Sequence, residues 1–358
     1  MKNTLIAAAV LLIIAFGVLY AISPVRPISW QPDANAGLKN MFMKNTTLDD
    51  VRVVNPNALA GPEDVFVSSD GIVYTGLNNG DVVAFPMHSP NDLKVIANTG
   101  GRPLGVRLDA LGNLIVSDPV KGLLSITPEG EITVLVKEYG GSPLLLIDHH
   151  EIAANGDIYF SNASARYDLN GYIYDFIEGT ATGGVFKYSP TSGKTTQLMS
   201  NLFFANGITL GPNDEYLLVA ETGKSRILKF QLSGTNKGQT KVFANNLPAM
   251  PDNLSFNGTD RFWVGMVSLR DWRVESLAAY PAVRRIMGAF PLEWFEPSSS
   301  YGFVLGFDLY GNVVANYQSP DSYTTVTSAY EHNGSLYLGS LHSNGIGILP
   351  LTTSNSVQ

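Results

Sequence analysis

The chain has 358 residues with 45% apolar character, and its 35 Gly, 20 Pro, 16 Tyr and 17 Phe are typical of short strands joined by tight turns, which predicts an all-β protein. Its net charge is −8 and its 23 basic residues are scattered, so it lacks the cationic surface that binds nucleic acid. The absence of cysteine excludes disulfides, thiolate nucleophiles and cysteine-ligated zinc, so any metal must be held by oxygen or imidazole.

The first element is an apolar segment, residues 5–22, with the sequence LIAAAVLLIIAFGVLYAI. A helix of this length, rising about 1.5 Å per residue, spans about 27 Å, close to the hydrocarbon thickness of a bilayer. Lys2 precedes the segment as a short positive region. The sequence therefore predicts a single-pass signal-anchor over residues 1–23, contact with the membrane through residues 5–22, and a Pro-rich tether over residues 24–44.

The main alternative to the anchor is a cleaved signal peptide, whereas a buried core helix is disfavoured because the segment is terminal and apolar all round. Ala21-Ile22-Ser23 offers small residues at the spacing of a cleavage site, although Pro24 would follow the cut and is poorly tolerated there. With an uncleaved anchor the protein is expected in the membrane with its body on the non-cytoplasmic side. With cleavage it is expected to be secreted.

From about residue 45 the sequence repeats one pattern: a Gly, Asp or Asn turn, an alternating strand that contains an aromatic residue, a small polar break and a second strand. The first turns of the six copies are marked by Gly71, Gly112, Gly156, Asp214, Asp260 and Gly334. Most of these residues recur at the spacing of a four-stranded blade, and the longer intervals indicate insertions. The sequence predicts a six-bladed β-propeller over residues 45–358, whose ring closure also removes exposed sheet edges.

Residues 269–297 interrupt this repeat with the sequence LRDWRVESLAAYPAVRRIMGAFPLEWFEP, which permits helix and interleaves arginines with aromatic residues. The arginines are Arg270, Arg273, Arg284 and Arg285, and the aromatic residues among them are Trp272, Tyr280, Phe290 and Trp294. We expect a partly helical insertion, residues 269–300, in the region of the fifth blade. Two interpretations stay open: a lid or membrane-surface segment, or a helical excursion packed on the propeller.

Oxygen-bearing side chains stand at or just before the first strand of four predicted blades. In chain order they are Glu63 and Asp64 in GPEDVFV, Asp148 in LIDHHEI, Asn206 in FFANGITL, and Asp252 and Asn253 in MPDNLSF. The first strands of a propeller line its central channel, so these side chains are expected to converge there. Carboxylate and amide oxygens are the ligands of Ca²⁺, whereas zinc favours histidine. At any one position the alternative is turn capping, but the same chemistry at four equivalent positions favours a metal site.

The chain also resembles the strictosidine synthase-like branch of six-bladed propellers, within the larger superfamily of gluconolactonases and paraoxonases. The resemblance covers about residues 50–350 and is carried by GPEDVFVSSDGIVYTG, GRPLGVRLDALGNLIVSD, KGLLSITPEGE, FFANGITLGPNDEYLLVAET, LPAMPDNLSFNGTDRFWVGM and YEHNGSLYLGSLHS. The motifs ANGI and PDN are short, but their order and spacing relative to GRPLG and VAET are specific.

The resemblance implies one calcium ion in the central channel. Its side-chain ligands would be Glu63, Asp148, Asn206, Asp252 and Asn253. Asp148 departs from the family, where asparagine is usual, and the added carboxylate would strengthen the attraction for a dication. Paraoxonase relatives hold a second, structural calcium with the acid that follows each of two ligands. Asp64 matches one of these acids but His149 stands at the other, so a second calcium is not expected.

The resemblance further implies a hydrolase of lactones or aryl esters, and of organophosphates, in which calcium polarises the carbonyl for attack by water. The general base would be a metal-bound acid or a histidine near the channel, so the catalytic candidates are Asp252, His150 and His149. Because side chains alternate along a strand, His150 is expected to lean the same way as Asp148, which makes it the better placed histidine.

Catalytic residues of two related enzymes are replaced in this chain. Asp118 stands where paraoxonases carry an active-site histidine, so that histidine is lacking. A residue at about Thr324 stands where strictosidine synthase carries its catalytic glutamate, so strictosidine synthase activity is not expected. Glu221 is a further acid, either catalytic or a partner of Arg226. A different class of function also stays open: a membrane-tethered propeller that does no chemistry, in which calcium is structural and one face binds a partner or carries a small molecule.

Overall fold

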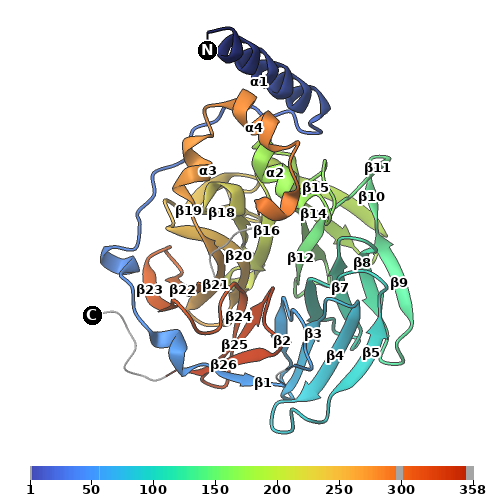
Figure 1. Cartoon of the computed structure of the whole chain (residues 1–358). Coiled ribbons are helices and arrows are strands. Elements are labelled where there is room, and N and C mark those ends of the chain that lie inside the picture. The colour runs from blue at the N-terminus through green and yellow to red at the C-terminus, as the bar shows by residue number, and fades with distance from the viewer. Residues whose placement is uncertain (1, 56, 296–300, 352–358) are drawn as a thin grey trace.

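The computed structural model describes residues 2–55, 57–295 and 301–351, and it folds them into a six-bladed β-propeller with an N-terminal apolar helix, α1 (Lys2–Ile22) (Figure 1). Each blade is a sheet of four antiparallel strands. The predicted fold class is confirmed, and the six predicted turns each join the first two strands of one blade.

The strands of the first five blades follow chain order. Blade 1 has β2 (Val65–Val67), β3 (Ile72–Gly76), β4 (Asp81–Pro86) and β5 (Lys94–Asn98). Blade 2 has β6 (Gly105–Leu108), β7 (Leu114–Asp118), β8 (Gly122–Ile126) and β9 (Ile132–Val136). Blade 3 has β12 (Ile147–Ile152), β13 (Ile158–Asn162), β14 (Gly183–Ser189) and β15 (Lys194–Leu202). Blade 4 has β16 (Ala205–Leu210), β17 (Tyr216–Glu221), β18 (Arg226–Gln231) and β19 (Thr240–Ala244). Blade 5 has β20 (Ala249–Phe256), β21 (Arg261–Leu269), β22 (Gly302–Asp308) and β23 (Val313–Ser319).

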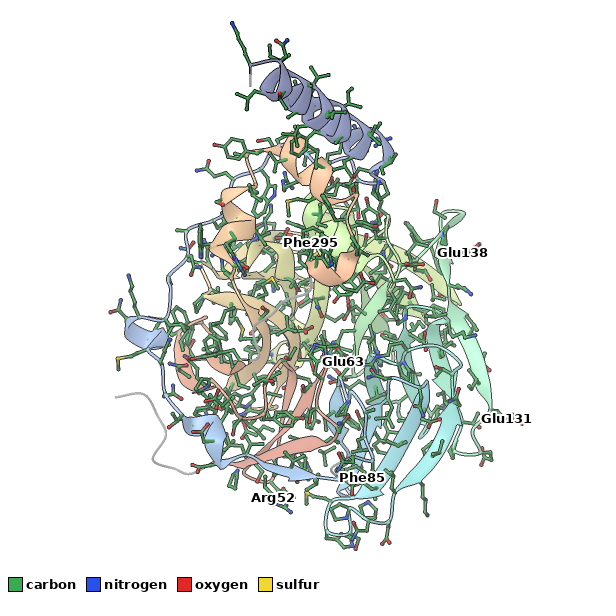
Figure 2. The ribbon with its side chains drawn as sticks, viewed as in Figure 1. Arg52, Glu63, Phe85, Glu131, Glu138 and Phe295 are labelled. Atoms are coloured by element: carbon green, nitrogen blue, oxygen red, sulfur yellow. The ribbon has the colours of Figure 1, made fainter. Side chains whose placement is uncertain are left out.

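Blade 6 joins the two ends of the propeller. It has β24 (Val326–His332), β25 (Ser335–Ser340) and β26 (Ile346–Pro350), and its fourth strand is β1 (Arg52–Val54) from the N-terminal side. β1 pairs antiparallel with β26, with Val53 opposite Gly347. The hydrogen bonds of this pair hold the ring closed. The first strands of neighbouring blades contact one another around the channel, with Glu63 close to the middle of the molecule (Figure 2).

Two long insertions leave the blades, and both connect a second strand to a third. The first carries α2 (Tyr172–Glu178) in blade 3, and the second carries α3 (Trp272–Ser276), α4 (Pro281–Met287) and the 3₁₀ turn η5 (Leu292–Trp294) in blade 5. The fifth-blade insertion was predicted, whereas α2 was not. Smaller elements are the 3₁₀ turns η1 (Asn40–Phe42), η2 (Thr47–Asp50), η3 (Pro212–Asp214) and η4 (Thr222–Lys224), and the hairpin β10 (Glu138–Tyr139) and β11 (Ser142–Pro143).

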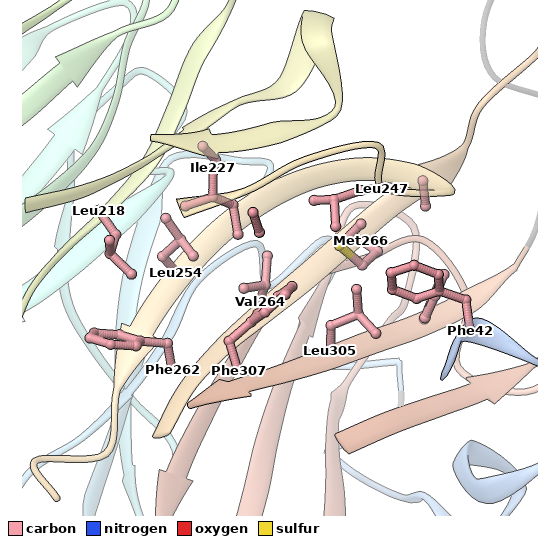
Figure 3. Close-up of a cluster of buried hydrophobic side chains, with 14 of the residues drawn as sticks. Phe42, Leu218, Ile227, Leu247, Leu254, Phe262, Val264, Met266, Leu305 and Phe307 are labelled. Atoms are coloured by element: carbon pink, nitrogen blue, oxygen red, sulfur yellow. The ribbon is translucent and has the colours of Figure 1, made fainter. Parts of the chain in front are cut away.

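The core lies between the blades, with one apolar cluster at each of the six junctions. Successive side chains of a strand point to opposite faces of its sheet, so one strand serves two junctions. In β17, Leu218 packs toward blade 5 and Leu217 packs toward blade 3. Figure 3 shows the largest cluster, where Phe262 and Leu254 of blade 5 meet Leu218. Burial on both faces explains why these strands read as nearly continuous apolar runs.

The segment between α1 and β1, expected in part as a tether, lies bound along the propeller. Val25 is fully buried, the Trp30 amide donates to the carbonyl of Ala278 over 3.3 Å, and the Ala36 amide donates to the carbonyl of Asn246 over 3.1 Å. Phe42 enters the cluster of blade 5 (Figure 3). The described residues therefore leave little free linker after α1, and the domain boundaries at residues 23 and 44 stay predictions.

Candidate metal centre

Five oxygen-bearing side chains meet in the channel at the end where the first strands begin, which we call the leading end. They are Glu63 just before β2, Asp148 in β12, Asn206 in β16, and Asp252 and Asn253 in β20. Each of the five residues is at most 5% exposed. One carboxylate oxygen from each of Glu63, Asp148 and Asp252 lies within 4.8 Å of the other two. The structure thus brings together three acids from three blades that are far apart in the sequence.

Irregular strand starts make this convergence possible. The pairing register shifts in β12 after Ile147, in β16 after Ala205 and in β20 after Pro251, and such bulges re-aim side chains. The motif ANG also has a steric reason, because a Cβ on Gly207 would lie 2.4 Å from the Cα of Asn253. Any larger residue at that position would push apart the blade starts that carry Asn206 and Asn253.

The oxygens of this cluster lack partners. Of the six buried carboxylate or amide oxygens of the described residues that have no hydrogen-bond partner, one is on Asp175 and the others belong to Glu63, Asp148, Asn206, Asp252 and Asn253. Buried oxygens are normally satisfied, and leaving one unpaired costs about 1–3 kcal/mol. Within the cluster, Asn253 Nδ2 donates to Glu63 Oε1 over 3.1 Å, which turns the Asn253 oxygen away from Glu63. The arrangement fits a cation that accepts oxygen ligands.

The electrostatics of the cluster agree with this fit. Burial and the neighbouring charges of Asp252 and Asp148 raise the pKa of Glu63 well above its ordinary value. Burial and Asp148 likewise raise the pKa of Asp252, and burial raises the pKa of Asp148 to about 7. Three carboxylates crowded out of water therefore resist ionising together, and a bound dication would remove that resistance.

Arg102 is a charged residue at this site that the sequence analysis missed. It stands at the start of blade 2, is 8% exposed, and donates to the carbonyls of Gly61 over 2.9 Å and Pro103 over 3.2 Å. Its charge lowers the pKa of Glu63 and of Asp148 and so offsets part of their repulsion. The signal was present in GRPLG, because Arg102 occupies the start of its blade as Glu63 does in blade 1.

Asp64 belongs to a separate ionic cluster. Arg107 Nη1 lies 2.6 Å from Asp64 Oδ2, and the Val106 amide donates to the same oxygen over 3.1 Å. Although burial opposes it, the Arg107 guanidinium holds the pKa of Asp64 well below its usual range. The negative charge of Asp64 is thus neutralised within the chain, and the expectation that no second calcium binds there stays a prediction.

The two histidines make contacts outside the acid cluster. His149 lies with its Nε2 3.5 Å from Asp64 Oδ2 and 3.1 Å from Arg107 Nη2, and its Nδ1 accepts from the Ile208 amide over 3.3 Å. His150 Nδ1 lies 2.8 Å from Ser117 Oγ in the neighbouring blade. The register shift in β12 interrupts the simple alternation on which the preference for His150 depended. Burial and the charge of Arg107 lower the pKa of His150 well below its ordinary value.

Two further acids have structural partners. Asp118 accepts from Thr99 Oγ1 over 2.7 Å and from the Val120 amide over 2.8 Å, so it caps the turn after β7. Glu221 binds Arg226 through two contacts of 2.6 Å, and its other oxygen accepts from the Phe203 amide over 3.0 Å. Two roles were left open for Glu221, and its contacts match the structural one, as the partner of Arg226. Its bond to the Phe203 amide also fixes the segment that leads into β16.

Protein freed of metal is expected to lose stability as the pH rises from about 4 to about 7. The pKa of Asp148 is raised from 3.8 to about 7 by burial, so in this range the folded state keeps a proton that the unfolded state has released. Glu63 and Asp252 shift in the same direction. The check is the melting temperature in chelator at about pH 5 and about pH 7.5, with calcium expected to reverse the loss at the higher pH. Equal melting temperatures in chelator would contradict this account of the cluster.

Comparison with known proteins places these features in a family. Residues 148–235 match the family described as strictosidine synthase, and residues 41–85 match the family described as strictosidine synthase-like, N-terminal. Strictosidine synthase-like 6 of Arabidopsis thaliana is 34% identical over 79% of this chain and 77% of its own length. Adipocyte plasma membrane-associated protein of Salmo salar is 31% identical over 90% of this chain and 83% of its own length.

Solved structures with low sequence identity share the fold. A gluconolactonase of Xanthomonas campestris superposes with a TM-score of 0.62 at 15% identity, covering 92% of this chain and 98% of that one. The calcium-binding protein regucalcin of Agrobacterium tumefaciens superposes with a TM-score of 0.58 at 12% identity, covering 90% of this chain and 96% of that one. These structures share the fold, and the 34% identity to strictosidine synthase-like 6 over more than two thirds of both chains shows that the chain belongs to the strictosidine synthase-like family.

Proposed function

We propose that this protein is a calcium-dependent hydrolase of lactones or aryl esters. Calcium would be held by Glu63, Asp148, Asn206, Asp252 and Asn253, the residues that the sequence predicted as ligands. One observation carries the proposal: each of these five residues has a buried side-chain oxygen without a hydrogen-bond partner among the described residues. The solved gluconolactonase and regucalcin share the fold and thereby support the choice of reaction and metal.

The donor set favours calcium over other common metals. Three carboxylates and two amides supply only hard oxygen ligands. They come from the first strands of blades 3, 4 and 5 and from the segment before the first strand of blade 1, so the coordination geometry is not forced to be octahedral. Zinc would recruit imidazole, but both ring nitrogens of His149 and the Nδ1 of His150 contact other groups. Calcium bound to such a set supplies Lewis-acid polarisation of an ester carbonyl, or of a phosphoryl oxygen in an organophosphate.

Asp252 is the residue we assign as general base. Its carboxylate belongs to the acid cluster, so it would lie beside a water that attacks a carbonyl polarised there. A hydrogen bond from Asn206 to Asp252 orients the carboxylate, and Asn253 orients Glu63 in the same way. His149 and His150 were the other candidates: His149 contacts Arg107 and Ile208, whereas His150 contacts Ser117 through Nδ1 and its Nε2 has no hydrogen-bond partner among the described residues.

The alternative function is a membrane-tethered propeller in which calcium is structural and one face binds a partner or a small molecule. One observation favours it: the five ligand residues are only 2–5% exposed, so little of the site meets solvent. In both functions calcium stabilises the folded state. Only in the first does the metal support turnover.

The test is to incubate the full-length protein in detergent with phenyl acetate and a panel of lactones, with and without chelator. We expect turnover with calcium and its loss after chelation. Thermal unfolding in parallel reports whether calcium binds. Calcium-dependent stabilisation without turnover of any substrate would favour the structural alternative, and turnover that survives verified metal removal would contradict the proposed mechanism.

A further inference from the structure

Exposed aromatic side chains gather on the insertion of blade 5. Four aromatic side chains outside α1 are strongly exposed in the described part of the chain. Three of the four lie on this insertion: Trp272 at 74%, Trp294 at 69% and Tyr280 at 58%. Val274 and Val283 lie exposed on the same insertion. Tryptophan and tyrosine favour the interface between membrane and water, where an apolar ring and a polar edge are both satisfied.

The arginines of the insertion do not form a cationic surface. Arg270 pairs with Glu275 over 2.5 Å, and Arg273 pairs with Asp271 over 2.6 Å. Arg284 is 2% exposed and donates only to backbone carbonyls among the described residues. Two of the four arginines thus pair with acids of the insertion and a third is buried, so little unpaired positive charge accompanies the exposed aromatic and aliphatic side chains.

The insertion contacts the end of α1, the helix long enough to span a membrane. α1 is 21 residues long, has a mean hydropathy of 2.9 and buries none of its residues. Its last turn contacts α4, because Arg285 Nε donates to the carbonyl of Tyr20 over 3.0 Å and its guanidinium lies 4.2 Å from the centre of the Tyr20 ring. Figure 1 shows α1, α4, α3 and α2 gathered on one side of the molecule.

The connection between α1 and the body packs against both insertions. Val25 packs with Ile173 and Ile177 of α2, and a Cβ on Gly288 would lie 2.4 Å from Val25 Cγ2. Arg284 Nη1 donates to the carbonyl of Ile177 over 2.9 Å, and Arg284 Nη2 also binds the carbonyl of Ile28. The few residues after the helix are thus tied to both insertions, so the direction of α1 limits the orientation of the propeller.

Strand direction places these insertions at the leading end. The first and third strands of an antiparallel blade run the same way, so a connection from the second strand to the third emerges where the first strand begins. α2 and the insertion with α3 and α4 are both connections of this kind. The acid cluster lies at the same end, because its residues stand at or just before the first strands.

We propose that the insertion of blade 5 lies in the surface of the bilayer that α1 crosses, and that it holds the leading end of the channel toward the membrane. The contact is made by Trp272, Tyr280 and Trp294 and needs no anionic lipid. This inference concerns orientation and is independent of whether the acid cluster supports catalysis.

The test uses tryptophan fluorescence of the full-length chain in nanodiscs of phosphatidylcholine that carries a spin label near the headgroup. The chain has four tryptophans, and we expect the label to quench Trp272 and Trp294 but not Trp263, which is fully buried. Trp30, the fourth tryptophan, is half-buried after α1, so it is replaced by Phe in every protein compared. In that background, quenching is expected to disappear in the Trp272→Phe/Trp294→Phe variant and to persist in the matched control Trp263→Phe. Adding phosphatidylserine is expected to change nothing.

Three results would overturn the inference: emission of the Trp30→Phe protein that the lipid label leaves unquenched, quenching that survives in the double variant, or recovery of the full-length chain free of lipid. Quenching that requires phosphatidylserine would also overturn it, because the contact would then be electrostatic. Both surface substitutions replace one exposed aromatic residue by another, so they keep the fold and make the comparison valid.

Discussion

Asp252→Asn is expected to lower calcium affinity by about 100-fold or more and to remove most turnover, since even residues that only orient ligands cost about 10–100-fold. The substitution removes one of three carboxylate charges that attract the ion, and an amide cannot accept the proton from water. In chelator the same variant is expected to melt higher than the wild type, because Asp252 no longer repels Asp148 and Glu63. Calorimetric calcium titration, hydrolysis of phenyl acetate and thermal unfolding measure the three effects.

The matched control is Glu151→Gln, which makes the same change of charge in the strand that carries Asp148. Glu151 is half-buried, lies 3.7 Å from Arg107 and is outside the acid cluster. Its substitution is expected to leave calcium affinity unchanged. Equal affinity of the Asp252→Asn variant and the wild type would refute the assigned metal site, whatever the turnover.

Arg107→Met is expected to lower the free energy of unfolding by about 3–5 kcal/mol, the usual cost of leaving a buried charge without its partner. Arg107 and Asp64 are each at most 5% exposed at the side chain, and their contact of 2.6 Å is the main neutralisation of Asp64. Arg107 also lies 5.7 Å from the ring centre of Phe66, so the apolar stem of methionine keeps part of the packing. Urea unfolding of the calcium-saturated protein gives the difference.

Two companion variants isolate the charge effect. The double variant Arg107→Met/Asp64→Asn is expected to recover much of the loss, because removing both charges of a buried pair costs far less than removing one. Arg273→Met breaks a pair of the same length at the surface and is expected to leave the free energy of unfolding almost unchanged, because water screens an exposed pair. If the double variant were less stable than Arg107→Met alone, the loss would come from packing and not from the charge of Asp64.

The ligand set was predictable because a propeller repeats one local environment. Glu63, Asp148, Asn206 and Asp252 each stand at the start of a blade, and equivalent strands converge on one axis, so equivalence in the sequence becomes proximity in space. The repeated turns between paired strands also revealed the blades themselves, because each blade places one such turn between its first and second strands. The ligand set and the blades could therefore be predicted without knowing any distance between residues.

The directions of neighbouring side chains could not be predicted in the same way. A bulge adds a residue without a clear mark in the sequence, so the alternation that favoured His150 does not hold in β12. Arg107 became the partner of Asp64 only through contact between blades 1 and 2, which lie 43 residues apart at these positions. The helix α2 was missed because seven residues give a periodic pattern too short to distinguish from a loop.

The class of fold, the number of blades, the apolar N-terminal helix and the chemistry of the acid cluster were predictable, because each depends on local periodicity or on residue type at repeated positions. Which charges are paired, which are left to a cation, and on which side of the propeller α1 and the helical insertions meet became visible in the folded chain alone. Those outcomes depend on close contacts between segments distant in the chain, such as Arg284 with Ile28 and Ile177, and packing rather than local pattern selects them.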